Sequence, residues 1–85
     1  LVKPQFEVGR EQVGRGGIVA DPALHHQALR GVAAAARELG YAVRAACPSP
    51  ITGSEGNREF FLHLVHAAGS DAPGWEQALS RAVQP

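Results

Sequence analysis

The chain has 85 residues, enough for one small domain near the lower limit for folding without disulfides or metals. Its eight basic side chains balance eight acidic ones, so the net charge of zero indicates neither a nucleic-acid partner nor a membrane surface. No apolar run reaches the length of a membrane span, and the single cysteine, Cys47, excludes an internal disulfide. These features favour a cytoplasmic protein with no membrane partner, in which Cys47 fills space in the core.

The first residues predict the end of a buried strand. Pro4 disfavours a helical conformation in the preceding residue, so we expect Lys3 to be extended. Because proline cannot donate to a central ladder, regular strand pairing should fail at this point. A lysine at the carboxyl end of a strand lies where open α/β sheets carry their chemistry, although a solvated surface lysine is the commoner case. Since the chain begins at Leu1, inside this strand and without an initiator methionine, we expect a piece of a longer protein.

Residues 8–19 predict a loop with demanding geometry, because four glycines permit positive φ and close backbone approach: Gly9, Gly14, Gly16 and Gly17. The pattern matches neither the dinucleotide-binding fingerprint nor a phosphate-binding loop. We interpret it as a shaped connection, with contact of Arg10 or Arg15 to a phosphate as the alternative.

A helix is predicted next, beginning at Asp21 and Pro22. Asp21 can cap the free amides, and Pro22 suits the first helical position because its missing donor is harmless there. Gly40 provides the left-handed cap that ends the helix. We expect His25 and His26 to be surface residues. The apolar positions follow the helical period and predict one buried stripe: Leu24, Ala28, Val32, Ala35 and Leu39.

Two strands follow, at residues 41–47 and 58–65. A strand, a helix and a further strand form the right-handed crossover unit of a parallel sheet. The loop between residues 47 and 58 is too short for a second crossover, so the last strand should run antiparallel to the strand before it. A metal site is not expected, because His63 and His66 would point to opposite faces of this strand.

The final predicted helix begins at Trp75, after a linker at residues 69–74. Trp75, Leu79 and Val83 recur at the helical period, so they share one face. We expect this face to lie against the sheet.

Lys3 and Glu59 are predicted to meet at one rim. If the last strand inserts between the first two and runs opposite to both, its start lies beside the end of the first strand. Side chains alternate along a strand, so Arg58 should face away from Glu59. A carboxylate entering an apolar run is costly unless it is paired, and Lys3 is the expected partner. The two residues alone leave a purely structural ion pair open.

Several separate motifs occur in order at suitable spacing: Leu1-Val2-Lys3-Pro4-Gln5-Phe6-Glu7, Val13-Gly14, Gly16-Gly17, Asp21-Pro22 and Ser49-Pro50-Ile51-x-Gly53-x-x-Gly56-Asn57-x-Glu59-Phe60. From residue 1 to about residue 65, they closely resemble the haemolysin A (TlyA) family of ribosomal RNA ribose methyltransferases, which have an FtsJ-like catalytic fold. The resemblance implies an α/β fold, namely the C-terminal part of a Rossmann-like, S-adenosylmethionine-dependent methyltransferase domain. Its expected order is strand, helix, strand, antiparallel strand and short helix, with residues 1–66 in that domain and residues 67–85 as a linker and helix packed on it.

The resemblance also implies a reaction. In this family the methyl group goes from S-adenosylmethionine to a ribose 2′-hydroxyl of ribosomal RNA, and catalysis is ascribed to a Lys-Asp-Lys-Glu tetrad. The last two members of the tetrad fall on Lys3 and Glu59. The other two, and the cofactor loop, would lie upstream, so this piece alone is expected to be inactive and to hold no cofactor-binding residue. Lysine can act as a cation beside the developing oxyanion or as the base, and the residues leave both open.

Two alternatives stand beside this interpretation. The piece could be a non-catalytic module that contacts ribosomal RNA or the ribosomal subunit through Arg10, Arg15 and Arg58. The historical family name points to membrane lysis, but no spanning or strongly basic amphipathic segment supports it. In addition, the open side of the first strand predicts self-association through strand pairing.

Overall fold

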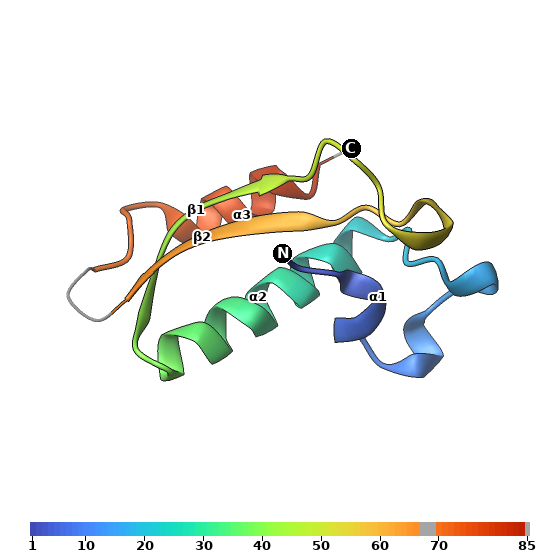
Figure 1. Cartoon of the computed structure of the whole chain (residues 1–85), viewed down its shortest axis with the longest axis horizontal. Helices are drawn as coiled ribbons and strands as arrows, with labels where there is room; N and C mark the ends of the chain where they lie inside the picture. The colour runs from blue at the N-terminus through green and yellow to red at the C-terminus, as the bar shows by residue number, and fades with distance from the viewer. Residues whose placement is uncertain (67–69, 85) are drawn as a thin grey trace.

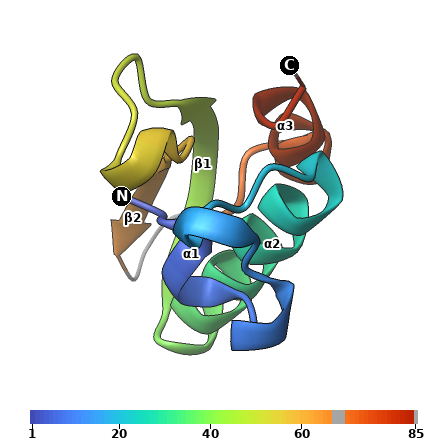
Figure 2. The same ribbon diagram turned by 90° about the vertical axis from the view of Figure 1, so that its right-hand side faces the viewer.

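The computed structural model describes residues 1–66 and 70–84, which form two layers. One layer is an antiparallel pair of strands, β1 (Tyr41–Pro48) and β2 (Phe60–His66). The other contains the helices α2 (Pro22–Glu38) and α3 (Trp75–Ala82), which lie on the same side of the strands (Figure 2). A short helix, α1 (Pro4–Glu7), lies close to the N-terminus (Figure 1). The fold is therefore a mixed α/β one, as predicted.

The opening strand is shorter than expected. Val2 forms one antiparallel bridge with Phe60, through backbone hydrogen bonds of 2.6 and 3.0 Å, and Pro4 then begins α1. Lys3 caps that helix in an extended conformation, with φ −115° and ψ 96°. Since Phe60 also pairs with Pro48, the start of β2 lies between the N-terminal residues and β1. The predicted insertion of the last strand between the first two is confirmed at this position.

The pairing of β1 with β2 runs from Tyr41 opposite His66 to Pro48 opposite Phe60, so the predicted antiparallel direction is confirmed. The other edge of β1 is occupied at one point by the segment that follows β2. There Ala72 donates its backbone N–H to the carbonyl oxygen of Val43 (2.9 Å). The Val43 N–H donates to the Asp71 carboxylate (2.8 Å).

Helix α2 has the predicted ends. The Asp21 carboxylate accepts a hydrogen bond from the Ala23 N–H (2.9 Å), and Gly40 adopts a φ of +91° just after the helix. The predicted stripe is confirmed for Ala28, which is buried, and for Leu24 and Val32, which pack against the core, but not for its last two residues. Ala35 and Leu39 are exposed, Leu39 by 73%, because Leu39 lies past the last helical residue and the alanine-rich sequence is apolar on two neighbouring bearings. The residues that α2 buries are His25, Ala28, Leu29, Ala33 and Ala36.

The expectation that His25 lies on the surface is wrong. Its ring is buried and tilts against the Phe60 ring, with 5.4 Å between the centroids. Its Nε2 donates to the Val19 carbonyl oxygen at 2.6 Å, and this bond makes an imidazole acceptable in the core. Its neighbour His26 is half-buried and bonds to the Ser80 hydroxyl of α3 at 3.3 Å.

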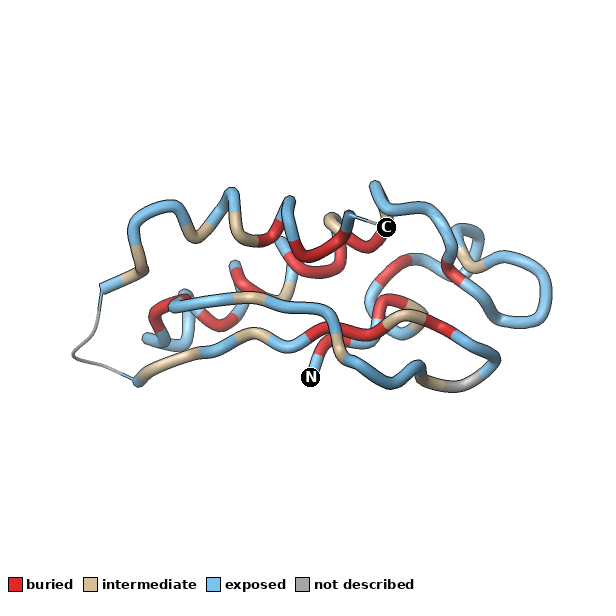
Figure 3. Tube along the Cα trace, turned by 90° about the horizontal axis from the view of Figure 1, so that it is seen from above, coloured by how far each residue is buried: buried red, intermediate tan, exposed pale blue. Residues whose placement is uncertain are grey.

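Buried segments gather where the helices face the strands (Figure 3). Leu79 and Val83 lie in this core and Trp75 packs against it, so the predicted face of α3 is confirmed. The first part of the predicted linker, residue 69, is outside the described residues. Cys47 is exposed, contrary to expectation, because it pairs with Phe61 on the face of the sheet that the helices leave open.

Candidate active site

The bridge between Val2 and Phe60 brings Lys3 and Glu59 to the same edge of the sheet. This edge, with Lys3 and Glu59, is the rim. Val2 and Phe60 exchange both of their backbone hydrogen bonds, so the next residues, Lys3 and Glu59, fall opposite each other. Lys3 is exposed, whereas Glu59 is only 7% exposed. The two chain segments therefore converge as the sequence predicts, while the catalytic roles of the two residues stay a prediction.

The Glu59 carboxylate is held by Gln5 instead of Lys3. Gln5 Nε2 donates to Glu59 Oε2 at 3.1 Å. Within residues 1–66 and 70–84, the ion pair closer than 4.0 Å joins Arg37 to Asp71, so the expected direct pair between Lys3 and Glu59 is not formed. The physical reason is that the lysine side chain stays in solvent, while the amide of Gln5, the second residue of α1, reaches the carboxylate.

The opposite wall of this carboxylate is the backbone of Gly53. A Cβ atom at Gly53 would lie 1.8 Å from Glu59 Oε2 and 2.4 Å from Cδ, so no other residue fits beside the carboxylate in this position. Gly53 is fixed by its N–H bond to the Asn57 carbonyl oxygen (2.7 Å). Gly53 belongs to a sequence motif, but its role cannot be predicted from that motif, because the need for a missing side chain depends on a contact with a residue six positions further along the chain.

Asn57 fastens the glycine-rich loop behind the rim. It is buried; its Oδ1 accepts from the Val19 N–H (2.9 Å), and its Nδ2 donates to the Gly17 carbonyl oxygen (2.8 Å). The loop at residues 8–19 is thus a shaped connection, as interpreted above. The role of Asn57 was also missed, although a buried asparagine amid glycines is a recognisable signal for backbone bonding.

The three arginines considered for RNA contact have different surroundings. Arg10 and Arg15 are exposed, each at the start of a single 3-10 turn (Arg10–Gln12 and Arg15–Gly17). Arg58 is half-buried and donates to the carbonyl oxygens of Val83 (3.1 Å) and Ala82 (3.5 Å). It thus caps the C-terminal end of α3, where a cation is favourable.

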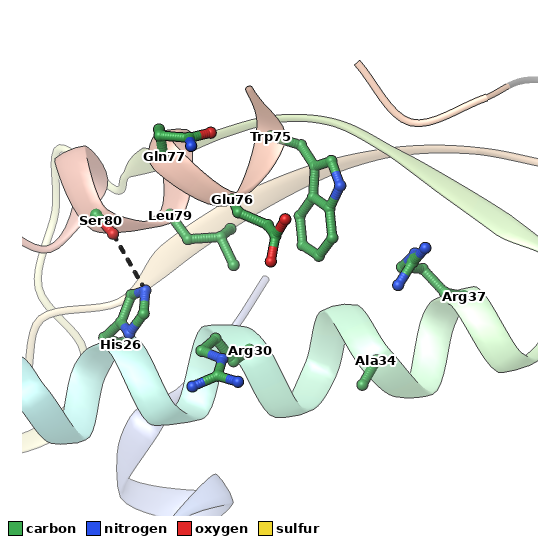
Figure 4. A pocket seen from close by; sticks show the side chains of 9 residues that line it. All are labelled: His26, Arg30, Ala34, Arg37, Trp75, Glu76, Gln77, Leu79 and Ser80. Atoms are coloured by element: carbon green, nitrogen blue, oxygen red, sulfur yellow. Dashed lines mark hydrogen bonds between the residues drawn. The ribbon is translucent and has the colours of Figure 1, made fainter. Parts of the chain in front are cut away.

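A groove of about 390 Å³ lies away from this rim, between α2 and α3 (Figure 4). Its lining includes Arg30 and Arg37 from one helix and Glu76 from the other. The Arg37 guanidinium lies 5.0 Å from the centre of the Trp75 ring and pairs with Asp71 at 3.0 Å. The groove is therefore a surface of mixed charge, and it includes neither Lys3 nor Glu59.

Neither Lys3 nor Glu59 lines the two hollows that lie on the helical layer. The groove above and a second hollow, at Ala23, Gln27 and Gly31, both lie on the helical layer. No group of three potential metal ligands gathers in the part of the chain that the structure describes. Over the same residues, no helix is long and apolar enough to cross a membrane.

Comparison with protein families gives one match. The model of the family described as FtsJ-like methyltransferase matches residues 1–66. That segment contains Lys3, Gln5, Gly53 and Glu59, so the whole rim lies within the matched region.

Two curated relatives and one solved structure are similar over nearly all of the chain. YqxC of Bacillus subtilis, which bears the name of an rRNA methyltransferase, is 49% identical over 89% of this chain. The 16S/23S rRNA (cytidine-2′-O)-methyltransferase TlyA of Mycobacterium tuberculosis is 46% identical over 98%. A crystal structure of a Lactococcus lactis protein named as a hemolysin superposes with a TM-score of 0.82, at 38% identity and 98% coverage. The chain spans 27% and 32% of the two relatives' lengths and 41% of the solved chain.

Proposed function

Because this chain belongs to the FtsJ-like methyltransferase family, we propose that the protein containing it methylates a ribose 2′-hydroxyl of ribosomal RNA. The observation that carries this proposal is the convergence of Lys3 and Glu59 at one rim, inside the segment that the family model matches. The substrate class follows the printed name of the M. tuberculosis relative. A ribosomal RNA substrate supports a cytoplasmic location, which is part of this proposal.

Lys3 and Glu59 would act on the hydroxyl that receives the methyl group. A sugar hydroxyl is a poor nucleophile, so its proton must be oriented or removed as the new bond forms. Lys3 would handle this oxygen, either as a cation that stabilises developing negative charge or as the base that takes its proton. Glu59, enclosed and fixed beside the start of β2, would orient the lysine or the ribose. In-line transfer depends strongly on such alignment.

FtsJ-like methyltransferases use S-adenosylmethionine as the methyl donor. Lys3 and Glu59 line neither the groove between α2 and α3 nor the hollow at Ala23, Gln27 and Gly31, so these two hollows offer no site for this molecule at the rim. We therefore assign its binding to the part of the relatives' length that this chain does not cover. The 85 residues alone should then transfer no methyl group.

The test is methyl incorporation into ribosomal RNA by the native protein that contains these residues. Lys3→Ala and Glu59→Ala should each lower kcat by about 100-fold or more, which is the usual contribution of a positioned acid or base. Arg81→Ala and Glu38→Ala remove exposed charges far from the rim along the chain and serve as matched controls that should keep full activity. Undiminished transfer by both rim variants would reject the assigned roles.

A second candidate is an RNA-contacting module. It is favoured by the exposure of Arg10 and Arg15, whose guanidinium groups make no hydrogen bond or ion pair to the other described residues. Arg58 is a poorer candidate for a phosphate contact, because its guanidinium already donates hydrogen bonds to the carbonyl oxygens of Val83 and Ala82. If these arginines bind phosphates, RNA affinity should fall with salt, and each Arg→Ala change should reduce the slope of log affinity against log salt by about 1. An unchanged slope would reject this candidate.

A further inference from the structure

We propose that Gln5 is a positioning residue that fixes the Glu59 carboxylate for its work at the rim. This inference rests on the proposed methyl transfer and assigns that site a further residue. Gln5 Nε2 donates to Glu59 Oε2 at 3.1 Å, which is the hydrogen bond that the described residues make to this carboxylate. Gln5 therefore acts through Glu59, without itself reaching the substrate.

The geometry leaves the carboxylate little freedom. On one side it is tied to the Gln5 amide, and on the other the Gly53 backbone is so close that a Cβ there would lie 1.8 Å from Oε2. Gly53 is in turn bonded to Asn57, which is anchored to the loop at residues 17–19. Oε2 is thus held from both sides. Among residues 1–66 and 70–84, no hydrogen bond occupies Oε1, so this oxygen is the one that can address Lys3 or a ribose hydroxyl.

The chemistry of the partner matters as much as its position. A lysine or arginine in place of Gln5 would hold the carboxylate equally well but would also neutralise it. The amide is an uncharged donor, so it fixes the geometry and leaves the negative charge available to a lysine. This arrangement suits a carboxylate that must orient a cation or a hydroxyl, whereas a purely structural anchor would gain from a charged partner.

The position of the Gln5 amide is also energetically unfavourable in one respect. Its Oε1 is buried and accepts no hydrogen bond from the described residues, which is unfavourable for a polar atom. Side chains selected only for stability seldom leave such an atom unpaired, and exceptions concentrate at functional sites. The cost is therefore consistent with a role for Gln5 in the site.

The first test replaces Gln5 by methionine in the native protein, because methionine keeps the length of the side chain and removes both amide groups. Gln5→Met should lower kcat by about 10-fold to 100-fold with KM for ribosomal RNA little changed, since the loss is one of alignment. Gln27→Met, at an exposed position of α2, is the matched control and should leave kcat unchanged. An unaltered kcat in a folded Gln5→Met variant would overturn the proposal.

Two further variants separate positioning from stability. Gln5→Lys keeps a donor but adds a positive charge; it should keep the melting temperature and still lower kcat. The double variant Gln5→Glu with Glu59→Gln restores an amide–carboxylate bond with the charge on the wrong residue. It should recover the melting temperature but not the activity. Full activity in either variant would show that Gln5 serves structure alone.

The outcome for Gln5 is distinguishable from the outcome for the site. If Lys3→Ala and Glu59→Ala abolish transfer while Gln5→Met retains it, the positioning role fails and the proposed function stands. If all three variants transfer methyl groups at the full rate, the roles assigned to Lys3, Glu59 and Gln5 fail. If the native protein transfers no methyl group to ribosomal RNA, the proposed function itself fails.

Discussion

At the rim, one carboxylate is enclosed and held by a neutral amide; in the groove between α2 and α3, charges of both signs lie open to solvent. The groove encloses about 390 Å³, yet its Arg37–Asp71 pair is an ordinary surface contact with side chains 49% and 22% exposed. Neither Lys3 nor Glu59 lines this groove, but backbone pairing, a glycine and an amide fix the carboxylate of the rim. For this chain, the constraint on a charged group marks a candidate site better than the volume beside it.

The largest expected loss of stability comes from removing the Phe60 side chain, which is buried next to Glu59. Phe60 is fully buried and pairs with both Val2 and Pro48, so Phe60→Ala should cost about 3–5 kcal/mol of unfolding free energy. Phe61→Ala is a matched control on the same strand; its ring is 44% exposed and the change should cost less than half as much. Equal losses in urea unfolding would contradict the packing described for β2.

The next largest effect is expected behind the rim. Asn57→Ala leaves the Val19 N–H and the Gly17 carbonyl without their partner, which should cost about 2–4 kcal/mol. Ser49→Ala removes an exposed hydroxyl bond to the Ile51 N–H and should cost under about 1 kcal/mol. Thermal unfolding of the two variants measures the difference, and similar melting temperatures would count against a central role for Asn57.

Replacing a glycine by alanine should have opposite effects on stability at the rim and on the surface of α2. Gly53→Ala forces the new Cβ against the Glu59 carboxylate, so it should destabilise the fold by about 1–3 kcal/mol and reduce methyl transfer. Gly31→Ala lies on the exposed surface of α2 with no atom within 4 Å of the new Cβ, so it should stabilise by about 0.5–1 kcal/mol. Calorimetry tests both, and destabilisation by Gly31→Ala would argue against the described surface of α2.

The smallest effect is expected in the groove. Arg37→Ala should cost at most about 1 kcal/mol, a loss that shrinks as salt is added, and should leave methyl transfer unchanged. Asp71→Ala should cost more, because Asp71 also accepts the Val43 N–H bond at 2.8 Å. A strong loss of transfer by Arg37→Ala would move the site from the rim to the groove.

Local sequence signals predicted the elements well. Asp21-Pro22 and Gly40 marked the ends of α2, and the short loop before β2 required an antiparallel strand. These features depend on residues close together in the chain. The insertion of β2 between Val2 and β1 was also foreseen, because strand direction limits which ends can meet.

What the sequence could not supply depends on contacts between distant residues. The alanine-rich helix allowed two apolar faces, and only packing against Phe60 places His25 inside. Charge favoured Lys3 as the partner of Glu59, but the turn of α1 brings Gln5 there instead. Arg58 was grouped with the RNA-contacting arginines because nothing near it reveals that α3 ends beside it.

The hydrogen bond between Ala72 and Val43 affects where a further strand could pair with the sheet. On the outer edge of β1, both backbone groups of Val43 are occupied. Its N–H donates to the Asp71 carboxylate, and its carbonyl oxygen accepts from the Ala72 N–H. A strand contributed by a neighbouring domain, or by another copy, would find no free backbone donor or acceptor at Val43. A strand that paired beyond Val2 would lie beside Lys3, so it would also build up the surroundings of the rim.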